Sequence, residues 1–256
     1  MHFSHSGNVI AGNGSTPLPV VCHTTTTAVD AAIGEYRDWA RIDYHPAIGD
    51  LAPAVVTGHL PAGSTALDVG CNKGGVSLFL AEHGFNVLGI DLNPAAIDQA
   101  AVNLAKLQAA DAELPGAVDF RVADILAEPI SGPFDVVLLV RVLTCFPAIS
   151  DWQALLQRAG ALVGPQGYLY IHDFLQSPDS ANYRARYDAG ARQGWRPGNF
   201  AVNNSAGALS FIAHHHSEED VASIMAPWHR VHFSIHQSLS LNGNECRMFE
   251  FLGRRP

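Results

Sequence analysis

Basic residues are scarce in this chain of 256 residues, in which 15 Lys and Arg stand against 24 Asp and Glu. The formal net charge is −9, and the basic residues form no cluster along the sequence. Binding to a nucleic acid requires a concentrated basic face that neutralises phosphates. We therefore expect no nucleic-acid partner.

Long apolar runs and paired cysteines are also lacking. No apolar run approaches the roughly 20 residues that cross a bilayer, and residues 1–27 show neither the basic nor the apolar segment of a signal peptide. The four cysteines, Cys22, Cys71, Cys145 and Cys246, share no CxxC spacing, so we expect neither a zinc cage nor a disulfide framework. These absences predict a cytoplasmic protein without a membrane partner.

Apolar residue types make up 48% of the chain, enough for one sizeable core. Residues 1–27 show no sustained period and are expected to form a flexible or docking arm. Residues 28–60 carry apolar and aromatic side chains, Tyr36 among them, at spacings of three and four, which predicts a helical N-terminal cap. We expect the main domain to span residues 61–256.

From residue 61 onward, short apolar strands alternate with helical patterns, which predicts an α/β domain built from parallel βαβ units. Strands are expected at 66–69, 86–90, 118–122, 134–140 and 168–171, and helices at 74–83, 94–107 and from a cap at Asp151 to residue 162.

The second half departs from this alternation. Residues 174–213 mix aromatic side chains with Gly, Asn and Arg, which indicates an inserted lid. Ser217 and Asp220 resemble a capping box that opens a helix to about residue 225. The segments 231–239 and 246–252, separated around Asn242-Gly243-Asn244, predict a closing antiparallel hairpin.

The sharpest local signal is the run from Leu67 to Gly75, a strand that enters a glycine turn and then a helix. Glycines allow a ligand to approach the backbone, and the helix N-terminus offers N–H groups to an anion. Asp91 ends the next strand, near the offset at which an acid meets ribose hydroxyls in nucleotide folds. An ordinary tight turn between strand and helix is the other interpretation of the glycines.

This stretch resembles motif I of class I S-adenosylmethionine-dependent methyltransferases, with Asp68, Gly70, Asn72 and Gly74 in the motif positions. Asn72 replaces the middle glycine, which leaves the motif in place because Asn tolerates left-handed backbone conformations. The same replacement weakens an NAD interpretation, in which Gly70, Asn72 and Gly75 would form G-x-G-x-x-G.

The resemblance continues over residues 60–173, through Asp91, Ala123-Asp124-Ile125, Phe134-Asp135-Val136-Val137 and the turn Leu162 to Gly167. It implies a Rossmann-like fold with a seven-stranded, mostly parallel sheet whose last strand is antiparallel, and S-adenosyl-L-methionine as cofactor. The residues that the resemblance assigns to the cofactor site are Tyr36, Asp68, Gly70, Cys71, Asn72, Gly74, Asp91, Leu92, Ala123, Asp124, Ile125 and Val140.

Residues that follow the fourth and fifth strands are expected to face the substrate, because ligands of open α/β sheets bind at the carboxyl ends of the strands. His172 is a candidate general base or a satisfied buried imidazole. Arg141 is a candidate carboxylate clamp or a member of an ion pair. Tyr183 and Tyr187, one helical turn apart on the lid, either line the substrate pocket or pack the lid onto the core.

The run His214-His215-His216 suggests a metal, but adjacent histidines point in different directions on a regular backbone. We therefore expect no metal site, and at most one of His214 and His216 in the pocket.

The leading functional hypothesis is in-line methyl transfer to a nitrogen, oxygen or carbon atom of a small-molecule metabolite, by a monomer or a homodimer. One alternative is a cyclase that consumes S-adenosylmethionine, forms azetidine-2-carboxylate and releases methylthioadenosine. A second alternative is a cofactor-binding module without turnover.

Overall fold

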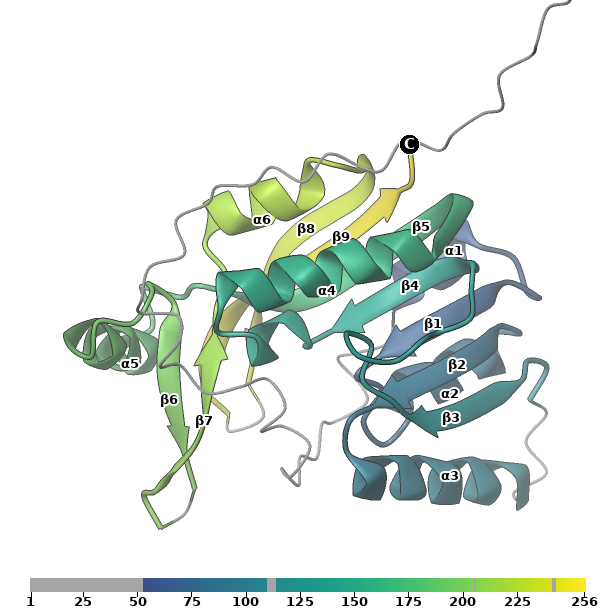
Figure 1. The fold of residues 1–256 in the computed structure, drawn as a ribbon, viewed down its shortest axis with the longest axis horizontal. Coiled ribbons are helices and arrows are strands. Elements are labelled where there is room, and N and C mark those ends of the chain that lie inside the picture. Colours follow the sequence, from purple (N-terminus) through teal and green to yellow (C-terminus); the bar gives the residue numbers. More distant parts are fainter. Residues whose placement is uncertain (1–52, 110–113, 205, 241–242) are drawn as a thin grey trace, which may run out of the picture.

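The computed structural model describes residues 53–109, 114–204, 206–240 and 243–256 (Figure 1). The expected arm, Tyr36 and most of the expected N-terminal cap lie outside the described residues. The first described helix is α1 (Ala54–His59), which belongs to the end of that cap. No helix in the described part of the chain is long and apolar enough to cross a membrane.

The main sheet has seven strands in the order β3-β2-β1-β4-β5-β9-β8. Five of them are parallel, and β9 runs antiparallel to both β5 and β8, so the expected α/β fold and closing hairpin are confirmed. The strands are β1 (Thr65–Val69), β2 (Asn86–Asp91), β3 (Val118–Val122), β4 (Phe134–Val140), β5 (Val163–Leu175), β8 (His229–Leu239) and β9 (Glu245–Arg254).

Helices cover both faces of this sheet. This is expected because β4 is apolar along its length and must be buried on both faces. On one face, Trp152 and Leu155 of α4 (Ile149–Leu162) and Ile224 of α6 (Glu218–Met225) belong to the larger apolar core. On the other face, Val56 of α1 and Leu80 of α2 (Gly75–Glu82) belong to a second core. The helix α3 (Pro94–Ala109) lies along β2 and β3 at the edge of the sheet (Figure 1).

The start of α4 and both ends of β5 differ from the sequence prediction by more than two residues, and β5 continues to Leu175, past the expected start of the lid at residue 174. The helix α4 begins at Ile149 with Ala148 as its N-cap, so Asp151 lies in the first turn and does not cap the helix. An acid in the first turn still interacts favourably with the helix dipole, which explains its place near the start. The strand β5 begins at Val163 and not at residue 168, because a register irregularity absorbs the residues between Val163 and Tyr168 in the pairing with β4. The predicted capping box of Ser217 and Asp220 on α6 is present.

An insertion, here defined as residues 176–215, separates β5 from α6. It contains α5 (Ala181–Arg192) and an antiparallel pair of strands, β6 (Asn199–Asn203) and β7 (Leu209–His214). The chain returns to the sheet at a bridge between Leu175 and His216. Figure 1 shows the insertion beyond the carboxyl end of β4, which is the end at which ligands of such sheets bind.

Candidate active site

The turn after β1 adopts left-handed backbone conformations at three positions. Gly70 has φ +70°, Asn72 +49° and Gly74 +83°. The expectation that Asn72 tolerates such a conformation is therefore confirmed. A side chain at position 70 would place its Cβ 2.7 Å from Cγ2 of Val142, so the loop after β4 approaches this turn too closely for any residue except glycine.

The Asp91 carboxylate holds this turn in place from the end of β2. Its Oδ2 accepts a hydrogen bond from the backbone N–H of Asn72 at 2.8 Å, and its Oδ1 accepts one from the N–H of Asn93 at 2.8 Å. The backbone N–H groups of Gly70 and Cys71 donate to the Ile90 carbonyl at 2.8 and 2.9 Å. Cys71 itself is buried. The turn and the end of β2 therefore form one rigid unit.

Asp68 lies beneath the same turn, with 1% of its surface exposed. Its Oδ2 accepts a hydrogen bond of 2.6 Å from the hydroxyl of Ser77 on α2. Burial raises the pKa of Asp68 to about 7, against the opposing effect of the Ser77 hydrogen bond, and the charge of Asp91 raises it further. Burial also raises the pKa of Asp91. Two carboxyl groups that repel each other thus surround a turn that a cation would stabilise.

The segment expected to meet an adenine follows β3. Ala123, Asp124 and Ile125 are all buried, and the N–H of Ala123 donates to the Asp91 carbonyl at 3.0 Å. The Asp124 Oδ1 accepts a hydrogen bond from the N–H of Leu126 at 2.9 Å, which fixes the direction of the carboxylate. Among the other expected cofactor residues, Leu92 is half-buried and Val140 is buried at the end of β4.

Arg141 follows β4 with a φ of +55°, and its N–H donates to the His172 carbonyl of β5 at 2.8 Å. Beside it, Asp173 is completely buried and accepts hydrogen bonds from the backbone N–H groups of Phe174 at 2.7 Å and Thr144 at 3.3 Å. Burial raises the pKa of Asp173 to about 7, although these hydrogen bonds act in the opposite direction. Asp173 therefore positions the loop after β4.

His172 is buried and belongs to a row of polar groups across β5, β9 and β8. Its Nε2 lies 3.3 Å from Nε2 of His236 on β8. His236 is half-buried and lines an open groove together with Asp179 and Ser238. The two imidazoles thus connect the buried end of β5 with the surface.

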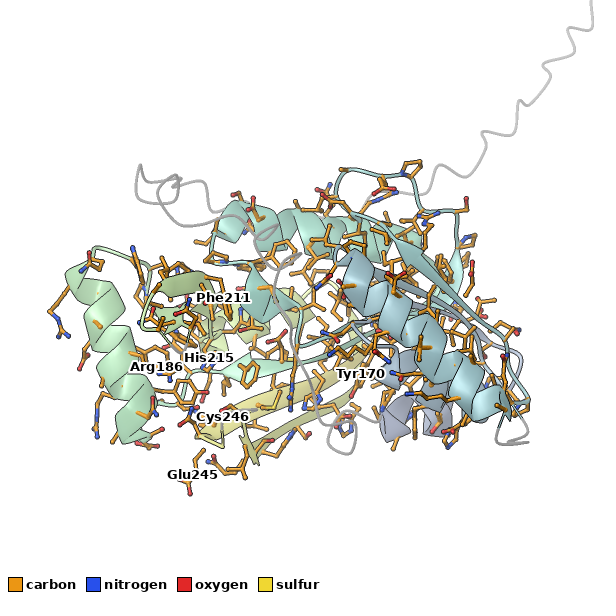
Figure 2. The ribbon with its side chains drawn as sticks, turned by 90° about the horizontal axis from the view of Figure 1, so that it is seen from below. Tyr170, Arg186, Phe211, His215, Glu245 and Cys246 are labelled. Carbon is orange, nitrogen blue, oxygen red and sulfur yellow. The ribbon has the colours of Figure 1, made fainter. Side chains whose placement is uncertain are left out.

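The two lid tyrosines lie on α5 and meet at His215. The Tyr187 hydroxyl accepts a hydrogen bond from the N–H of Ser177 at 3.3 Å and lies 2.7 Å from Nδ1 of His215. Burial lowers the pKa of that imidazole, which favours a neutral His215, and the tautomer of the ring sets whether Tyr187 donates or accepts in this hydrogen bond. Figure 2 shows His215 beside Arg186 and Cys246, well away from Tyr170.

The ring of His215 also stacks on Phe174 with a centroid distance of 4.8 Å. Tyr183 and Phe200 lie at 4.7 and 4.8 Å from the same imidazole. These rings join Cys246 and Met248 of β9 in a third apolar cluster. The tyrosines therefore pack the insertion against the sheet, as one of the two sequence interpretations expects, and their place in a substrate pocket stays a prediction.

The other two histidines of the run lie together, because residues two apart on a strand share a face. Ligand atoms of His214, His216 and Asp220 all lie within 4.8 Å of one another. His214 donates through Nδ1–H to Asn199 Oδ1 at 2.7 Å, and its Nε2 accepts from the guanidinium of Arg196 at 3.0 Å. Arg196 also forms an ion pair with Asp220. A cationic side chain thus already lies among these groups.

Sequence reasoning missed Met248, Cys246 and Phe174 as neighbours of the expected substrate side. The strand β9 is antiparallel, so its first residues lie where the parallel strands end. An antiparallel last strand predicts this position for the start of β9. The sequence alone does not show which of its side chains face Arg141.

The comparisons with known proteins agree with this geometry. A family described as "Methyltransferase domain" matches residues 40–223. The "Ubiquinone biosynthesis O-methyltransferase" of Pseudomonas paraeruginosa is 34% identical over 119 residues, which cover 46% of this chain and 47% of that protein. The "2-methyl-6-phytyl-1,4-hydroquinone methyltransferase" of Synechocystis is 37% identical over 121 residues, covering 47% of this chain and 35% of that protein. The chain thus matches about half, or less, of the length of these relatives.

The fold has close counterparts among solved structures. A crystal structure described as a SAM-dependent methyltransferase from Methanosarcina mazei superimposes with a TM-score of 0.72 at 24% identity, and the match covers 84% of this chain and 99% of that one. Sequence motif, strand order and family match all agree. The chain therefore belongs to the family of class I S-adenosylmethionine-dependent methyltransferases.

Proposed function

We propose that this protein transfers the methyl group of S-adenosylmethionine to a small molecule. The observation that carries the proposal is the turn from Gly70 to Gly74, held by Asp91 and backed by the buried Asp68. S-adenosylmethionine supplies an electrophilic methyl group on a sulfonium, so the protein needs to bind, orient and exclude water more than to react.

The residues present fit that compound better than a dinucleotide. A sulfonium and an ammonium group near the turn would favour the ionised forms of Asp68 and Asp91, whose pKa values burial raises, whereas a pyrophosphate would oppose their ionisation. The Asp91 carboxylate stands at the end of β2, where an acid of this fold accepts hydrogen bonds from ribose hydroxyls. Glycine at 70 and 74 allows the turn to pack closely against Val142 and Phe120, which any side chain at these positions would prevent.

On the acceptor side, the insertion would enclose the reacting atoms. Phe174, Tyr183 and Phe200 are buried in one apolar cluster, and Phe174 contacts Arg141 of the loop after β4, so this cluster would exclude water from a nucleophile that approaches there. Such surroundings would favour a small metabolite as acceptor over a macromolecule.

His172 is proposed as the residue that accepts the proton of the nucleophile. Its Nε2 lies within hydrogen-bond distance of His236, which opens onto a surface groove, so a proton taken up inside can leave through the second imidazole. Both H172A and H236A should then lower kcat by at least about tenfold with an unchanged affinity for S-adenosylhomocysteine. If H172A retains full turnover, His172 has no role in proton transfer and the site works by positioning.

The function is tested by incubating the purified protein with S-adenosylmethionine, first alone and then with a metabolite extract, and identifying the adenosyl product by mass spectrometry. We expect S-adenosylhomocysteine, formed when an extract is present. Methylthioadenosine as the product would contradict methyl transfer and indicate a reaction of the methionyl chain.

Calorimetry supplies the binding control for this experiment. S-adenosylhomocysteine should bind, and NAD should not. Binding of S-adenosylhomocysteine without any consumption of S-adenosylmethionine would indicate a cofactor-binding module without turnover.

A further inference from the structure

Arg141 is a buried cation with few polar partners in the described part of the chain. Its side chain lies on the acceptor side of the loop after β4, with 8% of the residue exposed. The one hydrogen-bond partner of its guanidinium among the described residues is the sulfur of Met248, at 3.9 Å. Its Nε is buried and has no hydrogen-bond partner among the residues that the structure describes. An ionised group in this state costs free energy unless a negative charge accompanies it.

The nearby acid balances this guanidinium only in part. Asp173 forms no ion pair with Arg141 within the described residues, and its two oxygens accept hydrogen bonds from the backbone N–H groups of Phe174 and Thr144. Burial raises the pKa of Asp173 to about 7, although the charge of Arg141 acts in the opposite direction, so this carboxyl group is partly protonated near neutral pH. Part of the positive charge of Arg141 is therefore left for a ligand to balance.

The surroundings of Arg141 indicate which kind of ligand that is. The guanidinium carbon lies 5.5 Å from the centre of the Phe174 ring. Phe174 belongs to the same cluster as Tyr183, Phe200 and Met248. A cationic group on an aromatic wall suits a ligand that combines a negative charge with a flat ring, because guanidinium groups bind carboxylates through paired hydrogen bonds and rings pack against rings.

The direction of the side chain separates this place from the cofactor turn. Arg141 extends toward β5 and β9, where it contacts Phe174 and Met248, whereas the turn of Gly70 to Gly74 adjoins β2. We propose that Arg141 binds the carboxylate of the methyl acceptor, and that this acceptor is a small aromatic carboxylic acid. This proposal rests on the proposed methyl transfer. It makes Arg141 a specificity-determining residue.

A matched pair of probes tests the proposal, because 4-hydroxybenzoate and 4-hydroxybenzamide share a ring and a hydroxyl and differ in charge. With the protein saturated with S-adenosylhomocysteine, the carboxylate should raise Tm by about 2 °C or more at millimolar concentration, and the amide should not. R141Q should abolish the response to the carboxylate. The control R184Q removes an exposed arginine of α5 and should keep it.

Two further measurements serve as controls. One distinguishes a lost binding site from a loss of folding, and the other distinguishes the carboxylate of the acceptor from that of S-adenosylhomocysteine. R141M keeps the length of the side chain and removes the charge, so it should raise Tm of the ligand-free protein by about 2–4 °C while losing the response to the carboxylate. S-adenosylhomocysteine also carries a carboxylate, but its affinity should change less than about threefold in R141Q, because we place the acceptor and not the cofactor on Arg141.

Three results would overturn the proposal. Equal shifts of Tm with 4-hydroxybenzoate and 4-hydroxybenzamide would show that the site does not distinguish a charged ligand from a neutral one. A lower Tm in R141M shows that Arg141 is paired within the protein. A loss of S-adenosylhomocysteine affinity in R141Q, together with no acceptor effect, assigns the arginine to the cofactor. In each case, binding of S-adenosylhomocysteine by the wild type leaves the proposed methyl transfer standing, and absence of that binding refutes it separately.

Discussion

The carboxylate of Asp91 has two roles. It accepts a hydrogen bond from the N–H of Asn72, which fixes the turn, and we propose that it also accepts hydrogen bonds from ribose hydroxyls. D91A should weaken the affinity for S-adenosylhomocysteine by about 2–4 kcal/mol, or roughly 30- to 1000-fold, because charge-assisted hydrogen bonds are lost. Isothermal titration measures this change. D98A, an exposed acid of α3, is the matched control and should bind as the wild type does. An unchanged affinity in D91A would remove this residue from the site.

The buried Asp173 predicts a specific dependence of stability on pH. Its pKa is raised to about 7 in the folded protein, so between the unfolded value and pH 7 the folded state holds a proton that the unfolded state has lost. The stabilisation from this group is present at acid pH and decreases as the pH rises through that window, by at most about 1.4 kcal/mol per pH unit.

D173N stays neutral at every pH and therefore lacks this dependence. The free energy of unfolding of D173N relative to the wild type should increase steadily from pH 5 to pH 7, on top of a constant cost for the backbone N–H that an amide nitrogen cannot accept from. Urea denaturation at four pH values checks the slope. A difference that stays constant over this range would show that Asp173 is ionised throughout.

Among the elements, the turn after β1 tolerates little change at Gly70. G70A combines a φ of +70° with a Cβ placed 2.7 Å from Val142 Cγ2. It should lower the free energy of unfolding by about 1–3 kcal/mol, as measured by urea denaturation, and weaken S-adenosylhomocysteine binding at the same time.

The double variant G70A/V142A separates the two causes. Removing the methyl groups of Val142 relieves the contact but not the backbone strain, so part of the loss in G70A should be recovered. Strict additivity of the two changes would show that Val142 does not limit the approach to the turn.

The elements predicted best from sequence are two of the parallel strands. The bounds expected for β3 and β4 are those observed, because β4 is a buried apolar run and β3 alternates apolar with charged residues, each between turn residues. The start of β5 was missed, since a strand that absorbs a Gly-Pro-Gln-Gly turn through a register irregularity looks like a break in the sequence. The pairing of the insertion with the sheet depends on contacts distant in sequence, and no local pattern reports them.

The histidine run shows the same limit within the site. Alternation along a strand predicts that adjacent histidines point in different directions. It also places His214 and His216 on one face of the strand, while His215 lies on the other face and contacts Tyr187. The residues of the cofactor turn were predictable because they are contiguous and depend on backbone conformation. The neighbours of Arg141 come from β5 and β9, and only the assembled sheet brings them together.

For the whole molecule, a ligand that binds the folded state alone must stabilise it by mass action. S-adenosylhomocysteine at about one hundred times its Kd should stabilise the fold by about 2.7 kcal/mol and raise Tm by about 5–10 °C. Differential scanning fluorimetry measures the shift, with NAD at the same concentration as control. A comparable shift with NAD would contradict the preference argued from the acidic turn.

The insertion leaves and rejoins the sheet at neighbouring positions: the N–H of Gln176 donates to the His216 carbonyl at 2.8 Å, and the N–H of His216 donates to the Phe174 carbonyl at 3.1 Å. Because the insertion begins and ends at one pair of hydrogen bonds, changes in its length or sequence do not affect the order of the strands in the sheet. Evolution can therefore exchange the residues of the insertion, and with them the proposed contacts to the acceptor, while the order of the strands stays as it is.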